Sequence, residues 1–176
     1  MVQSKEKILL HACCGICSAY PISLLIEMGY LPIVYFCNPN IDTLDEFNRR
    51  LEAQKIVCKH FNVELIVEDY FPESYLKYIS GYEKEPEKGL RCNKCIELRL
   101  IKTFEKSKEL KINKFTSSLV ISPHKNFNKI SEIGLTLSEN YQAIDFKKKD
   151  GFLKTNKIAK ELGLYRQNYC GCKFAK

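Results

Sequence analysis

Seven of the nine cysteines in this chain of 176 residues fall into three tight groups. The groups lie near the beginning, in the middle and close to the end of the chain: Cys13-Cys14-x-x-Cys17, Cys92-x-x-Cys95 and Cys170-x-Cys172. Sulfur ligands at such short spacings are typical of metal-binding and redox sites. We therefore expect a fold that brings these three distant segments together around one site.

The number and placement of the cysteines also indicate a compartment. Nine is an odd number, vicinal cysteines rarely form structural disulfides, and a chain of this length can bury a core without them. We therefore expect a reducing, cytoplasmic setting. The two isolated cysteines, Cys37 and Cys58, are predicted to be small buried hydrophobic residues.

Composition favours one soluble globular domain. The chain is 45% hydrophobic and 28% charged, and it has no repeat or low-complexity segment. We expect a single domain over residues 1–176, with its core at about 7–174. The apolar stretch at 8–26 contains His11, Gly15 and Pro21, so we predict strand, turn and helix there and no membrane association. The formal net charge of +7 makes a polyanion such as RNA a reasonable partner.

Hydrophobic periodicity predicts strands that alternate with helices. The strands are expected at residues 8–13, 31–37, 63–67, 115–121 and 143–146. The helices are expected at residues 19–28, 44–61, 74–79, 128–139 and 157–162, with a further long helix that Cys92 opens. This alternation predicts an α/β fold with a single, mainly parallel sheet and helices on both faces, a Rossmann-like three-layer sandwich.

Two of the cysteine groups could share one metal site. Such sheets bind ligands at the carboxyl ends of their strands, and Cys13 and Cys14 lie at the end of the first predicted strand. Cys92 and Cys95 lie three residues apart at a predicted helix start, so their sulfurs share one face and the helix N-terminus favours thiolates. Four thiolates suit zinc or an iron–sulfur cluster, and spacing alone does not choose between them.

Two further cysteine pairs have the spacing of dithiols. Cys14 and Cys17 match a thioredoxin-type pair between strand and helix, although that alternative leaves the other two groups unexplained. Cys170 and Cys172 would close a very small ring, so strain should make their disulfide easy to reduce. An electron relay needs a disulfide that is easy to reduce.

Six motifs together resemble the QueH-type epoxyqueuosine reductases, from about residue 7 to residue 174. They are His11-Ala-Cys-Cys-Gly-Ile-Cys-Ser18, Asn38-Pro-Asn-Ile41, Arg91-Cys-Asn-Lys-Cys95 with Leu98-Arg-Leu100, Ser122-Pro-His-Lys-Asn126, Asp145-Phe-Lys-Lys-Lys-Asp-Gly151 and Tyr165-Arg-Gln-Asn-Tyr-Cys-Gly-Cys172. The resemblance implies the last step of queuosine biosynthesis. In that step the epoxide of epoxyqueuosine, at the wobble position of a tRNA, is reduced by two electrons to an alkene without cobalamin.

The resemblance also implies a cofactor. Cys170 with Cys172 match a redox-active pair that an unidentified electron donor would serve. Cys17 would replace one cluster ligand or hold an additional mononuclear iron, with a carboxylate such as Asp69 or Asp145. Such an iron would be the Lewis acid for the epoxide oxygen. The implied ligands of a 4Fe-4S cluster are Cys13, Cys14, Cys92 and Cys95.

The family is similar in fold to the HUP class of nucleotide-binding α/β domains. There the loop after the first strand often carries a Ser-Gly-Gly-x-Asp-Ser phosphate grip. Here residues 13–18 occupy that place. The replacement argues against ATP binding and suggests a phosphate site rebuilt for metal.

Other residues are candidates for donating protons and for binding RNA. Reduction of the epoxide to alkene and water consumes two protons, for which His124, Lys125 and Tyr169 are candidates. Tyr165 and Tyr169 are candidates for stacking on a splayed base. His11 is predicted to be a hydrogen-bonding core residue. The expected basic patch consists of Lys125, Lys129, Lys147, Lys148, Lys149 and Arg166.

Two other classes of function remain open at this point. One is an iron–sulfur tRNA-thiolating enzyme of the HUP type, which should need ATP and an intact phosphate loop. The other is a zinc-stabilised RNA-binding module without catalysis, which would be colourless and indifferent to reductant.

Overall fold

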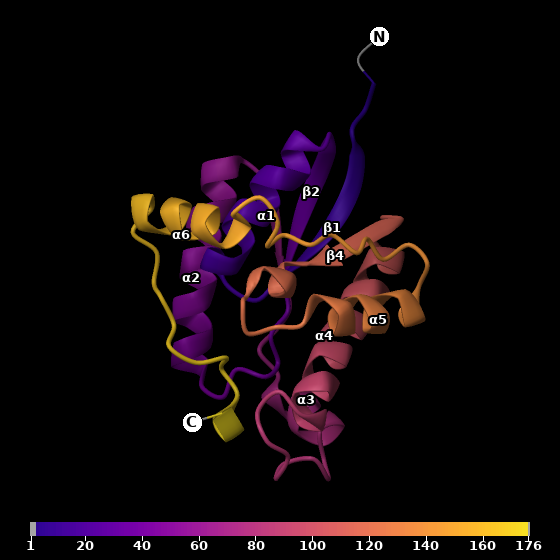
Figure 1. Ribbon diagram of the computed structural model, residues 1–176, viewed down its shortest axis with the longest axis vertical. Helices are drawn as coiled ribbons and strands as arrows, with labels where there is room; N and C mark the ends of the chain where they lie inside the picture. The colour runs from indigo at the N-terminus through magenta and orange to yellow at the C-terminus, as the bar shows by residue number, and fades with distance from the viewer. Residues whose placement is uncertain (1–2, 176) are drawn as a thin grey trace.

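One parallel sheet of four strands forms the centre of the computed structural model, which describes residues 3–175 (Figure 1). Its strand order is β3-β2-β1-β4. In the pairing of β1 with β2, Glu6 lies opposite Tyr30 and Ala12 opposite Phe36. The strands are β1 (Glu6–Ala12), β2 (Tyr30–Phe36), β3 (Glu64–Val67) and β4 (Lys114–Ser117).

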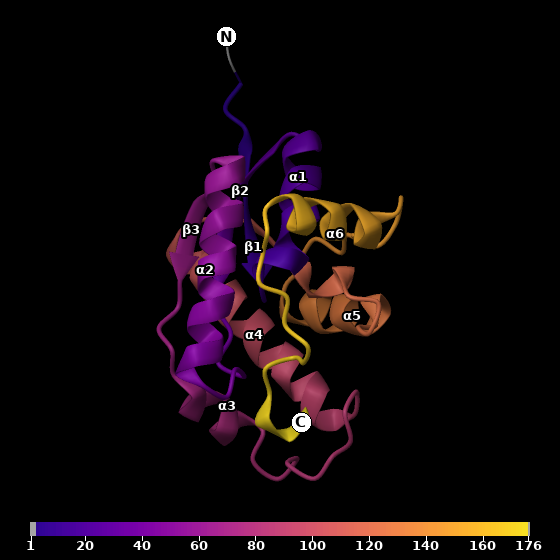
Figure 2. The same cartoon turned by 90° about the vertical axis from the view of Figure 1, so that its left-hand side faces the viewer.

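Helices cover both faces of this sheet (Figures 1 and 2). Helices α1 (Gly15–Glu27) and α2 (Leu44–Phe61) pack against each other on one face, whereas α4 (Leu90–Glu109) lies on the other and contacts β1 and β4. Helix α6 (Gly151–Glu161) packs on α1, and α5 (Phe127–Leu137) packs on α4. The predicted Rossmann-like three-layer α/β fold is therefore confirmed.

The remaining elements are short. They are α3 (Pro72–Tyr78) and the 3-10 helices Ser118–Ile121 and Lys173–Ala175. Within residues 3–175, no helix combines the length and apolar character needed to cross a membrane.

The centre of the core is β1, which is completely buried from Ile8 to Ala12. A parallel strand with helices on both faces has no polar face, so the buried part of β1 is apolar except for His11. The chain leaves β1 towards β2 and β3 on one side and returns on the other side as β4. The carboxyl end of β1 is therefore the switch point at which open α/β sheets bind ligands.

The first helix begins at Gly15, four residues before the predicted start at Ala19. The Cys14 thiol caps it by accepting a hydrogen bond from the backbone N–H of Cys17 (3.4 Å). Glycine is required at position 15 because a Cβ there would lie 2.8 Å from the backbone carbonyl of Ala53 in α2. The two helices thus approach closely at the end of β1.

Two strand predictions on the β4 side are wrong. The predicted strand 115–121 ends at Ser117, because the Ser117 hydroxyl accepts a hydrogen bond from the N–H of Leu119 (3.1 Å) and starts the 3-10 turn. The predicted strand 143–146 is absent. The chain meets β4 through an isolated bridge between Phe115 and Tyr141, and the Thr116 hydroxyl donates to the carbonyl of Gln142 (2.7 Å).

The last helix starts earlier than the prediction of 157–162. It begins at Gly151, which follows Asp150 in the left-handed conformation (φ 60°). A side chain at position 151 would collide with the carbonyl of Phe146. The longer helix carries Thr155 to α1, where its hydroxyl accepts from the N–H of Tyr20 (3.1 Å).

Candidate redox and metal site

The loop between β1 and α1 gathers three cysteines. The sulfurs of Cys13, Cys14 and Cys17 all lie within 4.8 Å of one another, and those of Cys13 and Cys14 are 3.9 Å apart. The cap at Cys14 and the first turn of α1 produce this approach, since the helix places residue 17 back over its own start. No other cysteine of residues 3–175 joins the group at that separation.

The pKa values of the three thiols in this group are shifted in opposite directions. Hydrogen bonds from Cys14 and Cys17 lower the pKa of the Cys13 thiol well below its ordinary value. The same contact with Cys13 raises the pKa of Cys14 to about 12 and that of Cys17 well above its ordinary range. These contacts therefore favour the thiolate form of Cys13 and the protonated form of Cys14 and Cys17. A metal would replace those two protons.

The second group lies in the first turns of α4. Cys92 is half-buried and its sulfur accepts from the backbone N–H of Lys88 (3.2 Å). Cys95 is buried among Tyr75, Leu98 and Cys172. Burial raises the pKa of the Cys95 thiol. The middle group and the C-terminal group therefore share one buried cluster, through Cys95 and Cys172.

The third group lies on the C-terminal tail. Cys170 is half-buried, whereas Cys172 is 4% exposed, and its sulfur lies 2.9 Å from the hydroxyl oxygen of Tyr75. Gly171 between them has φ +104°, a conformation that L side chains rarely adopt. This glycine turns the chain so that one thiol faces the pocket described below and the other faces the core.

An arginine of α2 holds this tail. The Arg50 guanidinium donates to the carbonyls of Tyr169 (2.8 Å) and Cys170 (3.0 Å), and its Nε donates to Glu46 (2.7 Å). Both side chains of this ion pair are buried. The other oxygen of Glu46 accepts from the Tyr165 hydroxyl (2.7 Å). One buried ion pair thus fixes the tail on both sides of residues 166–168.

Two further contacts bring the tail to the first cysteine group. The Gln167 side-chain amide donates to the Cys14 sulfur (2.8 Å). The backbone N–H of Asp42 donates to the carbonyl of Gly171 (2.8 Å), and the Tyr169 hydroxyl donates to the Asp42 carboxylate (2.7 Å). The end of the chain therefore closes over the end of β1.

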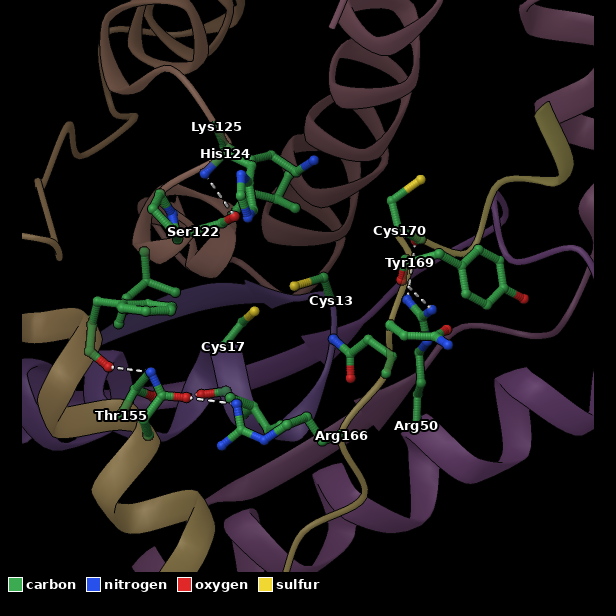
Figure 3. A pocket seen from close by; sticks show the side chains of 18 of the residues that line it. Cys13, Cys17, Arg50, Ser122, His124, Lys125, Thr155, Arg166, Tyr169 and Cys170 are labelled. Atoms are coloured by element: carbon green, nitrogen blue, oxygen red, sulfur yellow. Dashed lines mark hydrogen bonds between the residues drawn. The ribbon is translucent and has the colours of Figure 1, made fainter. Parts of the chain in front are cut away.

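A cavity of about 510 Å³ opens at this point. Figure 3 shows Cys13 and Cys17 in its middle, with Ser122, His124 and Lys125 on one side and Tyr169 and Cys170 on the other. Its charged lining is strongly positive, with one carboxylate, that of Glu87. The lining cations are Arg50, Lys88, Arg99, Lys125 and Arg166.

Arg99 is one of two deeply buried cations in this lining, at 4% exposure beside 3% for Arg50. Burial alone would lower its pKa, but the thiols of Cys95, Cys13 and Cys170 raise it above the ordinary value. One side chain therefore interacts electrostatically with a cysteine from each of the three groups. This is the physical link between groups that lie far apart in the sequence.

The predicted site residues divide into those that line the cavity and those that do not. Cys13, Cys17, Cys170, His124 and Lys125 line it, together with Tyr169 and Arg166. The structure brings Cys95 near Cys170 and Cys172 and groups Cys13, Cys14 and Cys17. The predicted residues outside the cavity lining are Cys14, Cys92, Cys95, Cys172, Tyr165, Asp69 and Asp145.

The predictions for the isolated residues are confirmed. Cys37 and Cys58 are buried, and burial raises the pKa of both thiols. His11 is fully buried, with Nε2 donating to the Cys37 carbonyl (2.9 Å) and Nδ1 3.0 Å from the Ser117 hydroxyl. Burial lowers the His11 pKa to about 4, so its imidazole is neutral.

Sequence reasoning missed the arginines that organise the site. Arg99 stands inside a motif that the resemblance singled out, but nothing local marks it as buried. Arg50 carried a usable signal, because Glu46, Arg50 and Gln54 repeat every four residues on the inward face of α2, where all three are buried. Polar residues on an inward face indicate a buried network.

Fold and site together define a class of protein. It is a Rossmann-like α/β protein in which cysteines occupy the loop after β1 and line a cationic cavity. An NMN synthetase from Francisella tularensis has a similar fold, with a TM-score of 0.56 at 14% identity over 95% of this chain and 68% of that one. That likeness concerns the fold alone.

Sequence comparison identifies the family. The family model described as epoxyqueuosine reductase QueH matches residues 8–176, so the chain belongs to the QueH family. The relative from Streptococcus pyogenes serotype M1 is 38% identical over 97% of this chain and 71% of its own length. Those from Staphylococcus epidermidis and Thermotoga maritima are 36% and 32% identical, over 76% and 89% of their lengths. All three are named epoxyqueuosine reductase QueH.

Proposed function

We propose that this chain is an epoxyqueuosine reductase, which reduces the epoxide of epoxyqueuosine in tRNA to the alkene of queuosine. The observation that carries the proposal is the cationic cavity at the switch point, where Cys13, Cys17 and Cys170 converge from both ends of the chain. Family membership supports the reaction, and the cavity supplies thiols and positive charge where the substrate would bind.

The donor set fits an iron–sulfur cluster. Soft thiolates select such clusters and zinc, and the buried guanidinium of Arg99 suits a group with net negative charge. The cluster would be a 4Fe-4S cluster held by Cys13, Cys14, Cys92 and Cys95. When bound, it supplies single-electron transfer without cobalamin. The approach of Cys17 to Cys13 and Cys14 supports its use as a ligand of the cluster or of an additional mononuclear iron.

Cys170 and Cys172 would supply the electron pair. Oxidation of the dithiol to a disulfide releases two electrons and two protons, and reduction of the epoxide to alkene and water consumes the same number. An external electron donor then returns the disulfide to the dithiol. The half-buried position of Cys170 at the cavity and the burial of Cys172 beside Tyr75 support an exchange between one accessible and one protected thiol.

His124 and Lys125 would deliver protons to the epoxide oxygen. Both line the cavity on the side opposite the tail (Figure 3). The Tyr169 hydroxyl donates to Asp42, so it is engaged elsewhere. The tip of the 122–125 loop is held by Lys147, whose ammonium donates to the Lys125 carbonyl (3.1 Å).

The tRNA would enter with its modified nucleotide in the cavity. The five cations of the lining attract phosphates, and Phe152 lines the same cavity while 41% exposed. An exposed aromatic ring suits stacking on a splayed base. Phe152 therefore takes the role that the sequence assigned to Tyr165, whose hydroxyl is bonded to Glu46 outside the lining.

The reaction can be tested on tRNA that carries epoxyqueuosine. The anaerobically reconstituted protein, with a chemical reductant, should convert epoxyqueuosine to queuosine, measured by mass spectrometry of the digested nucleosides. Cys13→Ser should abolish conversion, whereas Cys58→Ser, a buried cysteine outside the cavity, should retain it. Absence of conversion by wild-type protein with a full complement of iron and sulfide would contradict the proposal.

A further inference from the structure

The charge of Arg99 is not balanced by the protein. Its only hydrogen bond within the part of the chain that the structure describes is a long one, from Nε to the carbonyl of Cys95 (3.4 Å). No carboxylate of residues 3–175 forms an ion pair with it. A guanidinium carries five N–H donors, and a buried charge without a partner is strongly unfavourable.

The other two buried arginines make more hydrogen bonds than Arg99, although Arg91 also forms no ion pair with a carboxylate of residues 3–175 and its Nε has no partner. Arg50 pairs with Glu46 and donates to two carbonyls of the tail. Arg91, two turns before Arg99 on α4, donates to the carbonyls of Glu83 and Glu85. Both lie as deep as Arg99, at 3% exposure, so depth alone does not explain the missing partners.

The surroundings of Arg99 indicate which kind of anion would pair with its positive charge. The guanidinium lines the cavity together with Cys13 and Cys170, and its Nε donates to the carbonyl of Cys95. Each belongs to a different cysteine group. An anion that these groups jointly held would lie against the guanidinium at the wall of the cavity.

We propose that Arg99 is the fixed counter-cation of the thiolate-held iron–sulfur centre, and that it stabilises the bound centre and favours its reduced state. The inference rests on the proposed function, because the anion is the cluster proposed there. Reduction adds one negative charge to the centre. A fixed positive charge beside it therefore raises the reduction potential, since net charge and hydrogen bonds set the potential of such clusters. Arg99 is in these terms a positioning and electrostatic residue.

The test uses three variants of the full chain. Arg99→Met removes the charge and keeps most of the volume, and Arg99→Lys keeps the charge. Lys102→Met is the matched control, because it removes one positive charge from the same helix three residues further on, in a different pocket that Asp69 and Tyr70 line. Each is purified metal-free and also reconstituted anaerobically with iron and sulfide.

The first readout is the rise in melting temperature on reconstitution. Arg99→Met should melt at the wild-type temperature or higher when metal-free, because an unbalanced buried charge is gone, and should gain less on reconstitution. Lys102→Met and Arg99→Lys should gain as wild type does. An equal gain in melting temperature for Arg99→Met and wild type would overturn the proposal. Failure of metal-free Arg99→Met to fold would overturn it too, since the protein itself would then supply the partners of the Arg99 charge.

The second readout is the reduction potential, followed by the visible spectrum. Arg99→Met should shift it to more negative values, whereas Arg99→Lys and Lys102→Met should stay near wild type. If reconstituted Arg99→Met had the wild-type reduction potential, the proposed role of Arg99 would be wrong, whereas the proposed cluster would stand. If wild type takes up no iron or sulfide, the proposed cofactor is wrong, and that failure is seen before any variant is compared.

Discussion

Cys13 illustrates how the chemistry of one residue depends on its immediate neighbours. Its thiolate is favoured because Cys14 and Cys17 donate to it, and the cap of α1 places both within reach. Cysteine spacing in the sequence predicted this group and the loop in which it lies. It did not predict Arg99, because whether an arginine is buried depends on α4 packing behind β1, a contact between segments far apart in the chain.

Cys170 is predicted to carry electrons and not to hold the cluster. Cys170→Ser should therefore leave the visible spectrum and iron content of the reconstituted protein unchanged but abolish turnover, because serine cannot form the disulfide that releases two electrons. Absorption spectroscopy and the nucleoside assay measure the two effects on one sample. Loss of the spectrum in Cys170→Ser would instead make this residue a ligand, and Cys58→Ser is the control for loss of a buried thiol.

The elements of the chain differ in how far the sequence determined them. The central strands were predicted well because a largely apolar run reflects burial on both faces of a sheet. Helix α2 was predicted well because residues that recur about every four positions lie on one buried face. The apolar run at 115–121 looked equally like a strand. Its second half is a 3-10 helix because the Ser117 hydroxyl caps it, a local bond that periodicity does not register.

The C-terminal tail depends on α2 through one ion pair. Arg50→Lys should keep the charge beside Glu46 but remove the forked hydrogen bonds to the carbonyls of Tyr169 and Cys170. Hydrogen bonds to charged groups contribute about 1.5–3 kcal/mol each, so losing one should raise the open fraction of the tail by roughly ten- to a hundredfold.

Hydrogen exchange of residues 165–173 measures this opening. Arg49→Lys is the matched control, because Arg49 is the neighbouring residue of α2 and its ion pair with Asp45 is exposed. Faster exchange confined to the tail in Arg50→Lys, with Arg49→Lys unchanged, is the predicted pattern. Unchanged exchange of the tail in Arg50→Lys would show that this arginine does not hold it.

At the scale of the whole molecule, positive charge collects around the cavity that Cys13, Cys17 and Cys170 line. The formal net charge is +7, and the cavity lining holds five cations against one carboxylate. The overall charge and the α/β rhythm could be read from the sequence. The convergence of the first loop, α4 and the tail on one cavity could not, because it depends on how the tail crosses α2 and returns to the end of β1.

Binding of tRNA should therefore weaken steeply with salt. Replacing Lys125 or Arg166 with glutamine should reduce the slope of log K against log salt by about 1 for each phosphate that the variant no longer binds. Lys59→Gln, at the far end of α2, should leave the slope unchanged. Filter-binding titrations at several salt concentrations give these slopes, and a flat response in wild type would exclude phosphate binding.

The central claim is that the three cysteine groups build one iron–sulfur redox site. The most direct measurement is the iron, sulfide and zinc content and visible spectrum of anaerobically purified protein, with Cys92→Ser and Cys58→Ser beside it. The account predicts a brown protein that contains iron and sulfide and bleaches with reductant, with the colour lost in Cys92→Ser and kept in Cys58→Ser. A colourless wild-type protein with stoichiometric zinc would contradict it and favour a zinc-stabilised RNA-binding module.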